Sequence, residues 1–354
     1  MLAILSREVR NYLKRPLFWL GILIVILGVY SAVIPYLQIH YLAPEEQIVN
    51  SYPETIHAGD VFEGYIPSTP EERRAFWEAG IRQDLISVFG MSSAEAEAAV
   101  NAAKDLSLSE AFRYFEEKHS IARNAAAYEL TKYRKGTNEE INAYLADVLS
   151  QNPFSYYFSR KFADFASLYM GFFATIMLAV LFIQDTRRNT YELLHTKPVS
   201  AGSYVIGKAL GGFSACLIAL GTLNLVFWVL CLLFTRGSGF EVRLFDFIRA
   251  SCLYILPNML MIVCIYVLIS LLFKNPLPGV PLLILYIVYS NMGGRNADGV
   301  YGYHGRLLAV MVRFPGQFFD TAEPPWLLLN QSFLLAASAV MLLLSVQLWK
   351  RRRV

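Results

Sequence analysis

The chain contains few charged residues for its length. Asp, Glu, Lys and Arg make up 17% of its 354 residues, whereas a typical soluble domain has about 25%. Hydrophobic residues make up 55% of the chain, and many of them lie in runs too long for a globular core. The composition therefore argues against a soluble enzyme and favours a protein embedded in a bilayer.

Cysteine is scarce as well. The four cysteines, Cys216, Cys231, Cys252 and Cys264, all fall inside apolar runs. This placement argues against a disulfide framework or a thiolate metal site. We expect all four to be small buried hydrophobic residues.

Catalytic and nucleotide-binding motifs are missing. The five histidines form no H-E-x-x-H pair, and no G-x-S-x-G segment occurs, so neither a zinc hydrolase nor a serine hydrolase is indicated. Gly202 to Lys208 has the G-x-x-x-x-G-K spacing of a phosphate-binding loop, but Ala209 stands where a hydroxyl must bind magnesium. We expect no metal or cofactor on this chain and no enzymatic activity of its own. Lys208 is predicted to be an anchor that extends its amine toward the inner lipid surface.

Six apolar runs are long enough, or nearly so, to cross a bilayer, which takes about 20 residues. The fifth run has only about 15 residues, near 22 Å of helix. The sequence therefore predicts an all-α polytopic membrane protein. The predicted spans are 17–37, 165–183, 204–234, 247–273, 277–291 and 326–349.

Basic residues close to the span ends set the expected orientation. With the N-terminus inside, 13 of the 31 basic residues lie in or beside the cytoplasm, and both termini are cytoplasmic. We therefore expect a multi-pass protein of the plasma membrane. The first 15 residues alternate apolar side chains with Arg7, Arg10 and Lys14, a pattern typical of a helix that lies in the membrane interface.

Residues 39–161 form a large loop between the first two spans. The loop carries 12 basic and 19 acidic residues, a net charge of −7, so the rest of the chain carries +10. Four segments inside it match the capping box, in which a hydroxyl and a carboxylate three residues later satisfy free backbone amides. They begin at Thr69, Ser92, Ser107 and Thr137. We therefore expect a mainly helical extracellular domain at 39–161, between a first part at 1–38 and a membrane domain at 162–354.

A second pattern within this loop is the apolar spacing from Leu106 to Leu130. Its steps of three and four residues predict a helix with one buried face. The stretch from Gln47 to Pro67 is less regular, and we expect short strands or loops there.

Polar side chains inside the predicted spans are few and mild. Asn224, Asn258 and Asn291 are candidates for a substrate path. The alternative, which the chemistry favours, is hydrogen bonding between helices.

An inner loop at 185–203 contains a short amphipathic segment. Tyr191 and Leu194 share one face of a short helix that ends before Pro198, with Arg188 and Glu192 as its charged neighbours. Its apolar face has two possible docking places: lipid headgroups, or a groove on a soluble partner.

These features resemble the permease subunits of the type-2 ABC exporters. The resemblance is carried by Arg7, Arg10 and Lys14 before the first span, by the inner loop from Arg188 through Glu192 to Lys197-Pro198, and by Gly207-Lys208 in the third span. The short fifth span, followed by an outer segment at 292–325, is similar to the re-entrant external helices of that family. The loop at 39–161 is larger than in the small members, so it resembles a subset with an enlarged first extracellular loop.

The resemblance implies a dimer with a second copy or a homologous permease, driven by cytoplasmic ABC ATPase subunits that hold ATP and magnesium. Arg188, Tyr191, Glu192 and Leu194 would then form the coupling helix. The expected function is outward transport of an amphipathic or hydrophobic substrate, such as a peptide, a lipid-linked molecule or a drug, along a path between two copies lined by spans such as the second and fifth. Membrane lipids are further expected partners, and nucleic acid is not. The alternative is a membrane-anchored sensor or binding protein that uses the extracellular helical domain.

Overall fold

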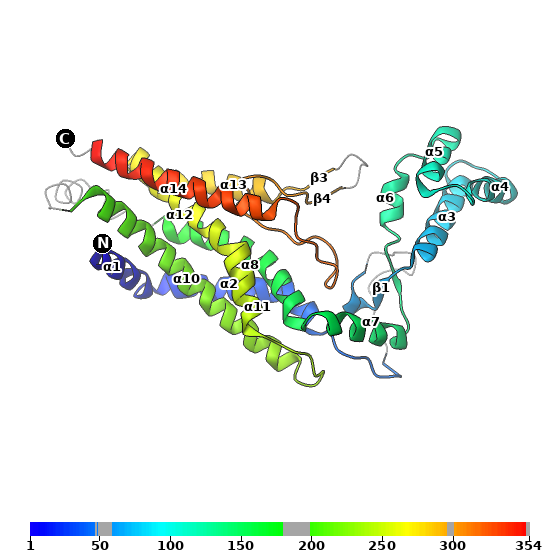
Figure 1. Ribbon diagram of the computed structural model, residues 1–354, viewed down its shortest axis with the longest axis horizontal. Coiled ribbons are helices and arrows are strands. Elements are labelled where there is room, and N and C mark those ends of the chain that lie inside the picture. Colours follow the sequence, from blue (N-terminus) through cyan, green and yellow to red (C-terminus); the bar gives the residue numbers. More distant parts are fainter. Residues whose placement is uncertain (47, 49–58, 180–198, 296–300, 352–354) are drawn as a thin grey trace. The chain divides into compact units, whose positions relative to one another are not determined.

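The computed structural model describes residues 1–46, 48, 59–179, 199–295 and 301–351 (Figure 1). These residues divide into two compact units. The membrane unit comprises residues 1–38, 152–292 and 303–354, and the loop unit comprises residues 39–151 and 293–302.

The regular elements described in the membrane unit are all helices, and a non-helical segment lies at 303–325. Five of its helical segments are long and apolar enough to cross a bilayer, and α13 is a shorter apolar helix. The predicted all-α polytopic fold is thereby confirmed. The helices are α1 (Leu2–Leu13), α2 (Pro16–Leu37), α8 (Phe154–Leu178), α10 (Ala201–Phe234), α11 (Leu244–Ala250), α12 (Leu256–Phe273), α13 (Gly279–Asn291) and α14 (Leu327–Arg351).

Helices α8 and α12 form the core of this unit. In their most apolar windows, 72% of the residues of α8 and 67% of those of the α11–α12 segment are buried, against 28% for α2 and for α14. Gly28 lets α2 approach α8 closely, since a Cβ there would lie 2.3 Å from the Tyr169 ring. Helices α2 and α14 therefore leave many of their apolar side chains exposed, as expected of helices that face lipid. Cys252 is also exposed, so the prediction of buried cysteines is confirmed only for Cys216, Cys231 and Cys264.

One π-helical turn, Ser251–Ile255, joins α11 to α12. It lies just before Pro257, which has no N–H to donate to the preceding turn. Single π turns inside α-helices often mark functional positions.

The start of α8 differs from the sequence-based boundary at 162. The helix begins at Phe154, because Phe154, Phe158 and Phe162 share a buried face. The sequence-based boundary assigned the first turns of α8 to the polar loop because they contain the charged residues Arg160 and Lys161.

The loop unit is mainly helical, with two short strand pairs. Strand β1 (Tyr65–Pro67) pairs antiparallel with β2 (Tyr133–Lys135), and the Ser68 amide donates to the Lys132 carbonyl at 2.9 Å. Strands β3 (Gly294–Arg295) and β4 (Tyr301–Gly302) form the second pair. The other elements are a 3-10 turn (Val61–Glu63), α3 (Pro70–Ser87), α4 (Ser93–Ala103), α5 (Leu108–His119), α6 (Asn124–Glu129) and α7 (Asn138–Gln151).

All four predicted capping boxes form. Thr69, Ser92 and Ser107 cap α3, α4 and α5. Thr137 and Glu140 exchange the corresponding two hydrogen bonds at the start of α7. The serine hydroxyl and then the backbone amide lower the pKa of Glu95 and of Glu110, because both donate to the charged carboxylate.

The single helix predicted from Leu106 to Leu130 is wrong. Ser120 and Arg123 adopt left-handed backbone conformations that end α5 and precede α6. The apolar spacing survives across the break because both helices pack on Trp77 and its neighbours. Leu130 lies at the end of the pattern and is 64% exposed.

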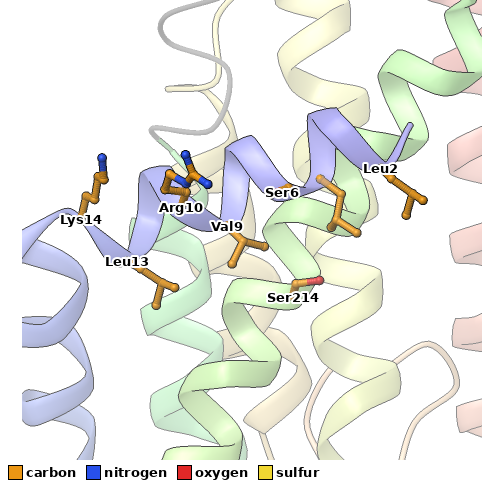
Figure 2. Close-up of a pocket in the computed structure, with 8 residues that line it drawn as sticks. Leu2, Ser6, Val9, Arg10, Leu13, Lys14 and Ser214 are labelled. Atoms are coloured by element: carbon orange, nitrogen blue, oxygen red, sulfur yellow. The ribbon is translucent and has the colours of Figure 1, made fainter.

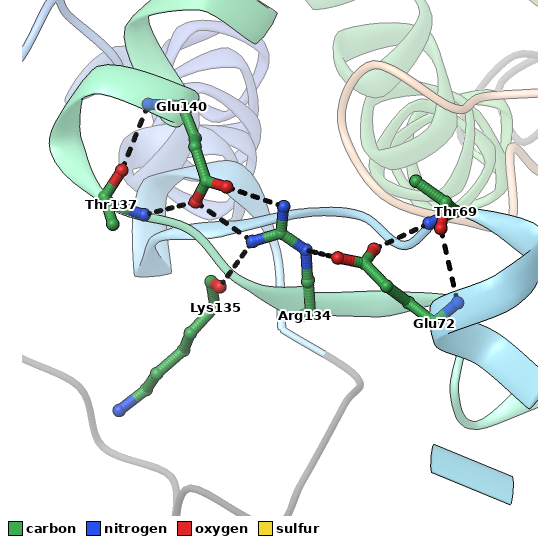
Figure 3. A network of polar contacts seen from close by, with 6 residues as sticks. All are labelled: Thr69, Glu72, Arg134, Lys135, Thr137 and Glu140. Atoms are coloured by element: carbon green, nitrogen blue, oxygen red, sulfur yellow. Dashed lines mark hydrogen bonds and ion pairs between the residues drawn. The ribbon is translucent and has the colours of Figure 1, made fainter. Parts of the chain in front are cut away.

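Arg134 of β2 connects two of the capping boxes (Figure 3). Its guanidinium bonds both carboxylate oxygens of Glu140, at 2.8 and 3.0 Å, and forms an ion pair with Glu72 at 2.9 Å. The hydrogen bonds from Arg134, followed by the one from the Thr137 amide, lower the pKa of Glu140 to about 2. The strand pair is thereby joined to the first turns of α3 and α7.

Candidate functional site

Helix α1 lies directly on α10. Two glycines of α10 permit this approach: a Cβ at Gly207 would lie 3.1 Å from Ile4, and one at Gly211 would lie 2.5 Å from the Glu8 Cβ. The second glycine of the G-x-x-x-x-G-K spacing therefore serves helix packing. Close approach over small residues four apart is a common mode of association in membrane helices.

Lys208 does not extend to the lipid surface as predicted. Its Nζ forms an ion pair with Glu8 at 2.9 Å, with side-chain exposures of 6% and 10%. A cation removed from water requires a partner, and Glu8, on the face of α1 toward α10, supplies it. The sequence-based anchor is thus a helix-to-helix contact.

A groove of about 620 Å³ runs between α1 and Ser214 of α10. Figure 2 shows Val9 and Leu13 directed to the same side of α1 as Ser214, with Arg10 and Lys14 directed the opposite way. Arg7, Arg10 and Lys14 are all exposed, in agreement with an amphipathic α1. The apolar lining is completed by Leu2 and Leu5.

The predicted coupling residues Arg188, Tyr191, Glu192 and Leu194 lie outside the described residues. The Ser200 hydroxyl caps the start of α10 by accepting from the Ser203 amide. At this end of the membrane unit, Tyr204 of α10 stacks on Trp349 of α14 with a centroid distance of 4.3 Å. The start of α10, the end of α14 and α1 therefore lie together (Figure 1).

Two of the three candidate asparagines, Asn224 and Asn291, join separate parts of the chain, and Asn258 bonds within its own helical segment. Asn224 accepts from the Ser251 hydroxyl of the π turn at 2.8 Å. Asn258 donates to the Tyr254 carbonyl at 2.7 Å, and Asn291 accepts from Arg313. The hypothesis of hydrogen bonding between helices therefore holds for Asn224. The contacts of the three asparagines do not require any of them to face a substrate path.

A charged cluster in the first half of α8 was not predicted from the sequence. Asp164, whose side chain is 5% exposed, forms an ion pair with Arg313, 149 residues away. Lys161 donates to the carbonyls of Phe314 at 3.2 Å and of Gly316 at 2.6 Å. Ionisable groups within membrane helices are costly and often functional. Lys161 and Asp164 lie three residues apart, on one helical face beside a predicted span, and this spacing could have indicated the cluster.

These contacts attach the segment 303–325 to α8. No residue of this segment is helical, so the expectation of re-entrant helices within 292–325 is wrong for this part. Residues 309–312 of the segment are nevertheless buried, and Val310 and Met311 pack among Met261, Ile287 and Leu334 of three helices. The segment is thus held in place by apolar packing and by its contacts with Asp164 and Lys161, and not by helical hydrogen bonds.

No group of three or more His, Cys, Asp or Glu able to hold a metal occurs among the residues that the structure describes. His119 instead packs against the rings of Tyr114 and Phe115.

Comparison with known protein families matches residues 2–304 to the family described as ABC-2 family transporter protein. The match covers most of the chain and ends before α14. No curated protein and no solved structure matches the chain.

Proposed function

Because the chain belongs to the ABC-2 transporter family, we propose that it is the membrane-spanning permease subunit of an ATP-driven exporter. The observation that carries this proposal is the family match over residues 2–304 together with the bundle of membrane helices. A separate ATPase subunit binds ATP and magnesium, and this chain binds neither.

The ATPase docks on the inner side of the bundle, where both termini lie. Helix α1 and the loop at 185–203 form the receiving surface. Tyr191 and Leu194 supply apolar anchors, and Arg188 and Glu192 supply polar contacts. The sequence pattern of an amphipathic segment bounded by Pro198 supports this assignment.

Substrate moves outward between this chain and a second permease copy or a homologous permease. Helix α8 is mostly buried within one chain, whereas α13 exposes Leu282, Leu285 and Val288. We therefore place α13 rather than α8 along the path. An apolar wall of this kind suits an amphipathic peptide, a lipid-linked molecule or a hydrophobic drug.

The test is co-purification of the full chain with its ATPase, followed by measurement of ATP hydrolysis and transport in proteoliposomes. Glu192→Ala and Leu194→Ala are each expected to weaken association or to uncouple hydrolysis from transport. Lys350→Gln, which changes an exposed residue near the end of α14, is the control.

Normal association and coupling in both variants would remove the coupling assignment. If no ATPase co-purifies and a kinase does, the chain is instead a sensor that uses its loop unit. The family match favours transport over that alternative.

A further inference from the structure

We propose that the groove between α1 and α10 is a binding site for one anionic phospholipid. An acyl chain occupies the apolar part of the groove, and the phosphate lies between Arg10 and Lys14. The site requires only a membrane-embedded chain and no particular transport direction, and it shares α1 with the proposed receiving surface for the ATPase.

The size and the apolar lining of the groove suit a lipid chain. Its volume of about 620 Å³ lies within the range of about 300 to 1,000 Å³ found for small-molecule sites. Leu5, Val9 and Leu13 form one apolar wall, and Ser214 is the contribution of α10. The lining contains two serine hydroxyls, those of Ser6 and Ser214, which expose little polar surface to an acyl chain.

The charge of the groove selects an anionic headgroup. Arg10 and Lys14 both line it, one helical turn apart, so their side chains lie on one face of α1. Within the described part of the chain, neither has an ion-pair partner. Glu8 is the one acidic residue among the first 44, and Lys208 neutralises it in the helix contact. Nothing anionic on α1 therefore competes with a phosphate.

The charged and the apolar side chains that line the groove point to different sides of α1. Figure 2 shows Arg10 and Lys14 directed away from the bundle and Val9 and Leu13 directed along it. A helix in the membrane interface places basic side chains at headgroup level and apolar ones toward the acyl chains. The basic side chains of the site thus match the headgroup of a lipid, and the apolar side chains match its acyl chain.

The test is native mass spectrometry of the full-length chain in mild detergent, titrated with phosphatidylglycerol and with phosphatidylcholine of the same acyl chains. We expect the first phosphatidylglycerol to bind at least fivefold more tightly than phosphatidylcholine. Arg10→Gln and Lys14→Gln are each expected to weaken it about fivefold, the effect of one basic residue beside an anionic lipid. Arg7→Gln is the matched control, because Arg7 is exposed on α1 without lining the groove.

Ser214→Phe tests the groove separately from the charge. It fills the space while Arg10 and Lys14 remain, so the preference for phosphatidylglycerol should disappear. Glycerol 3-phosphate, which lacks acyl chains, should not displace the lipid at equal concentration.

The proposal is overturned if both lipids bind equally, if Arg7→Gln weakens binding as much as Arg10→Gln, if Ser214→Phe leaves binding unchanged, or if glycerol 3-phosphate competes. Loss of ATPase coupling in the Glu192→Ala variant with lipid binding intact would separate this site from the proposed transport function.

Discussion

Glu8 of α1 and Lys208 of α10, 200 positions apart in sequence, form an ion pair at 2.9 Å with almost no access to solvent. Since Glu8 is the one acidic residue among the first 44, this pair fixes the rotation of α1 about its axis.

Glu8→Gln is expected to destabilise the chain by about 3 kcal/mol, because removal of one partner leaves a buried charge uncompensated. Unfolding can be followed with a thiol-reactive dye that reports exposure of the buried Cys216, Cys231 and Cys264, in a Cys252→Ser background. The double variant Glu8→Met with Lys208→Met should recover most of the loss, since a well-packed apolar pair often replaces a buried ion pair at little cost. A single variant as stable as Arg7→Gln would contradict the assignment.

Gly211→Ala is expected to displace α1 from α10. Its new Cβ would lie 2.5 Å from the Glu8 Cβ, and overpacking of this kind costs about 1 to 3 kcal/mol. Gly221→Ala is the matched control on the same helix, because nothing lies within 4 Å of a Cβ there. The same dye assay should show a loss for Gly211→Ala only. Equal stability of the two variants would show that α1 does not rest on Gly211.

Arg313→Gln is expected to release the segment 303–325 from α8. Asp164 then remains buried without its cation, at a cost of about 3 kcal/mol. Limited proteolysis of the full chain should yield new cleavage sites between 303 and 325. Arg236→Gln is the control, because Arg236 is exposed and lies outside the segment 303–325. Identical cleavage patterns in both variants would argue against the anchor.

The stability of the loop unit is expected to depend on Glu140 in acid. The pKa of Glu140 is lowered from 4.5 to about 2 by Arg134 and the Thr137 amide. A lowered carboxyl pKa stabilises the fold above pH 4.5, and that contribution is lost as the pH falls from 4.5 toward 2. The difference in unfolding midpoint between the native chain and Glu140→Gln should therefore shrink across this window.

Trp77, which is buried in the loop unit, reports this unfolding by fluorescence when the other four tryptophans are replaced by Phe. Glu139→Gln removes the same charge from an exposed neighbour and is the control. A difference that stays constant down to pH 2 would mean that Arg134 does not hold the carboxylate.

Local features of the fold could be predicted from sequence, and distant pairings could not. Capping boxes and long apolar runs depend on residues a few positions apart, so Thr69 with Glu72 and the span at Pro16–Leu37 were accessible. The partners of Lys208 and Asp164 lie 200 and 149 positions away, and nothing in their neighbourhood identifies them. Lys208 was therefore placed at the lipid surface, where an unpaired lysine would be most stable. The break between α5 and α6 escaped detection because neither Ser120 nor Arg123 is a residue that usually adopts a left-handed conformation.

The pairing of β1 with β2 has a consequence for how this chain can vary in length. Residues 68–132, which contain α3 to α6, leave one strand and return to its neighbour, so their two ends are joined by the Ser68 to Lys132 hydrogen bond. A segment whose ends meet can be removed, exchanged or enlarged while the flanking strands keep their register. A hairpin turn of two to five residues is enough to close the same gap. The helices of the loop unit thus form an exchangeable insert, and a shortened chain built this way provides a direct means to separate what the insert does from what the membrane helices do.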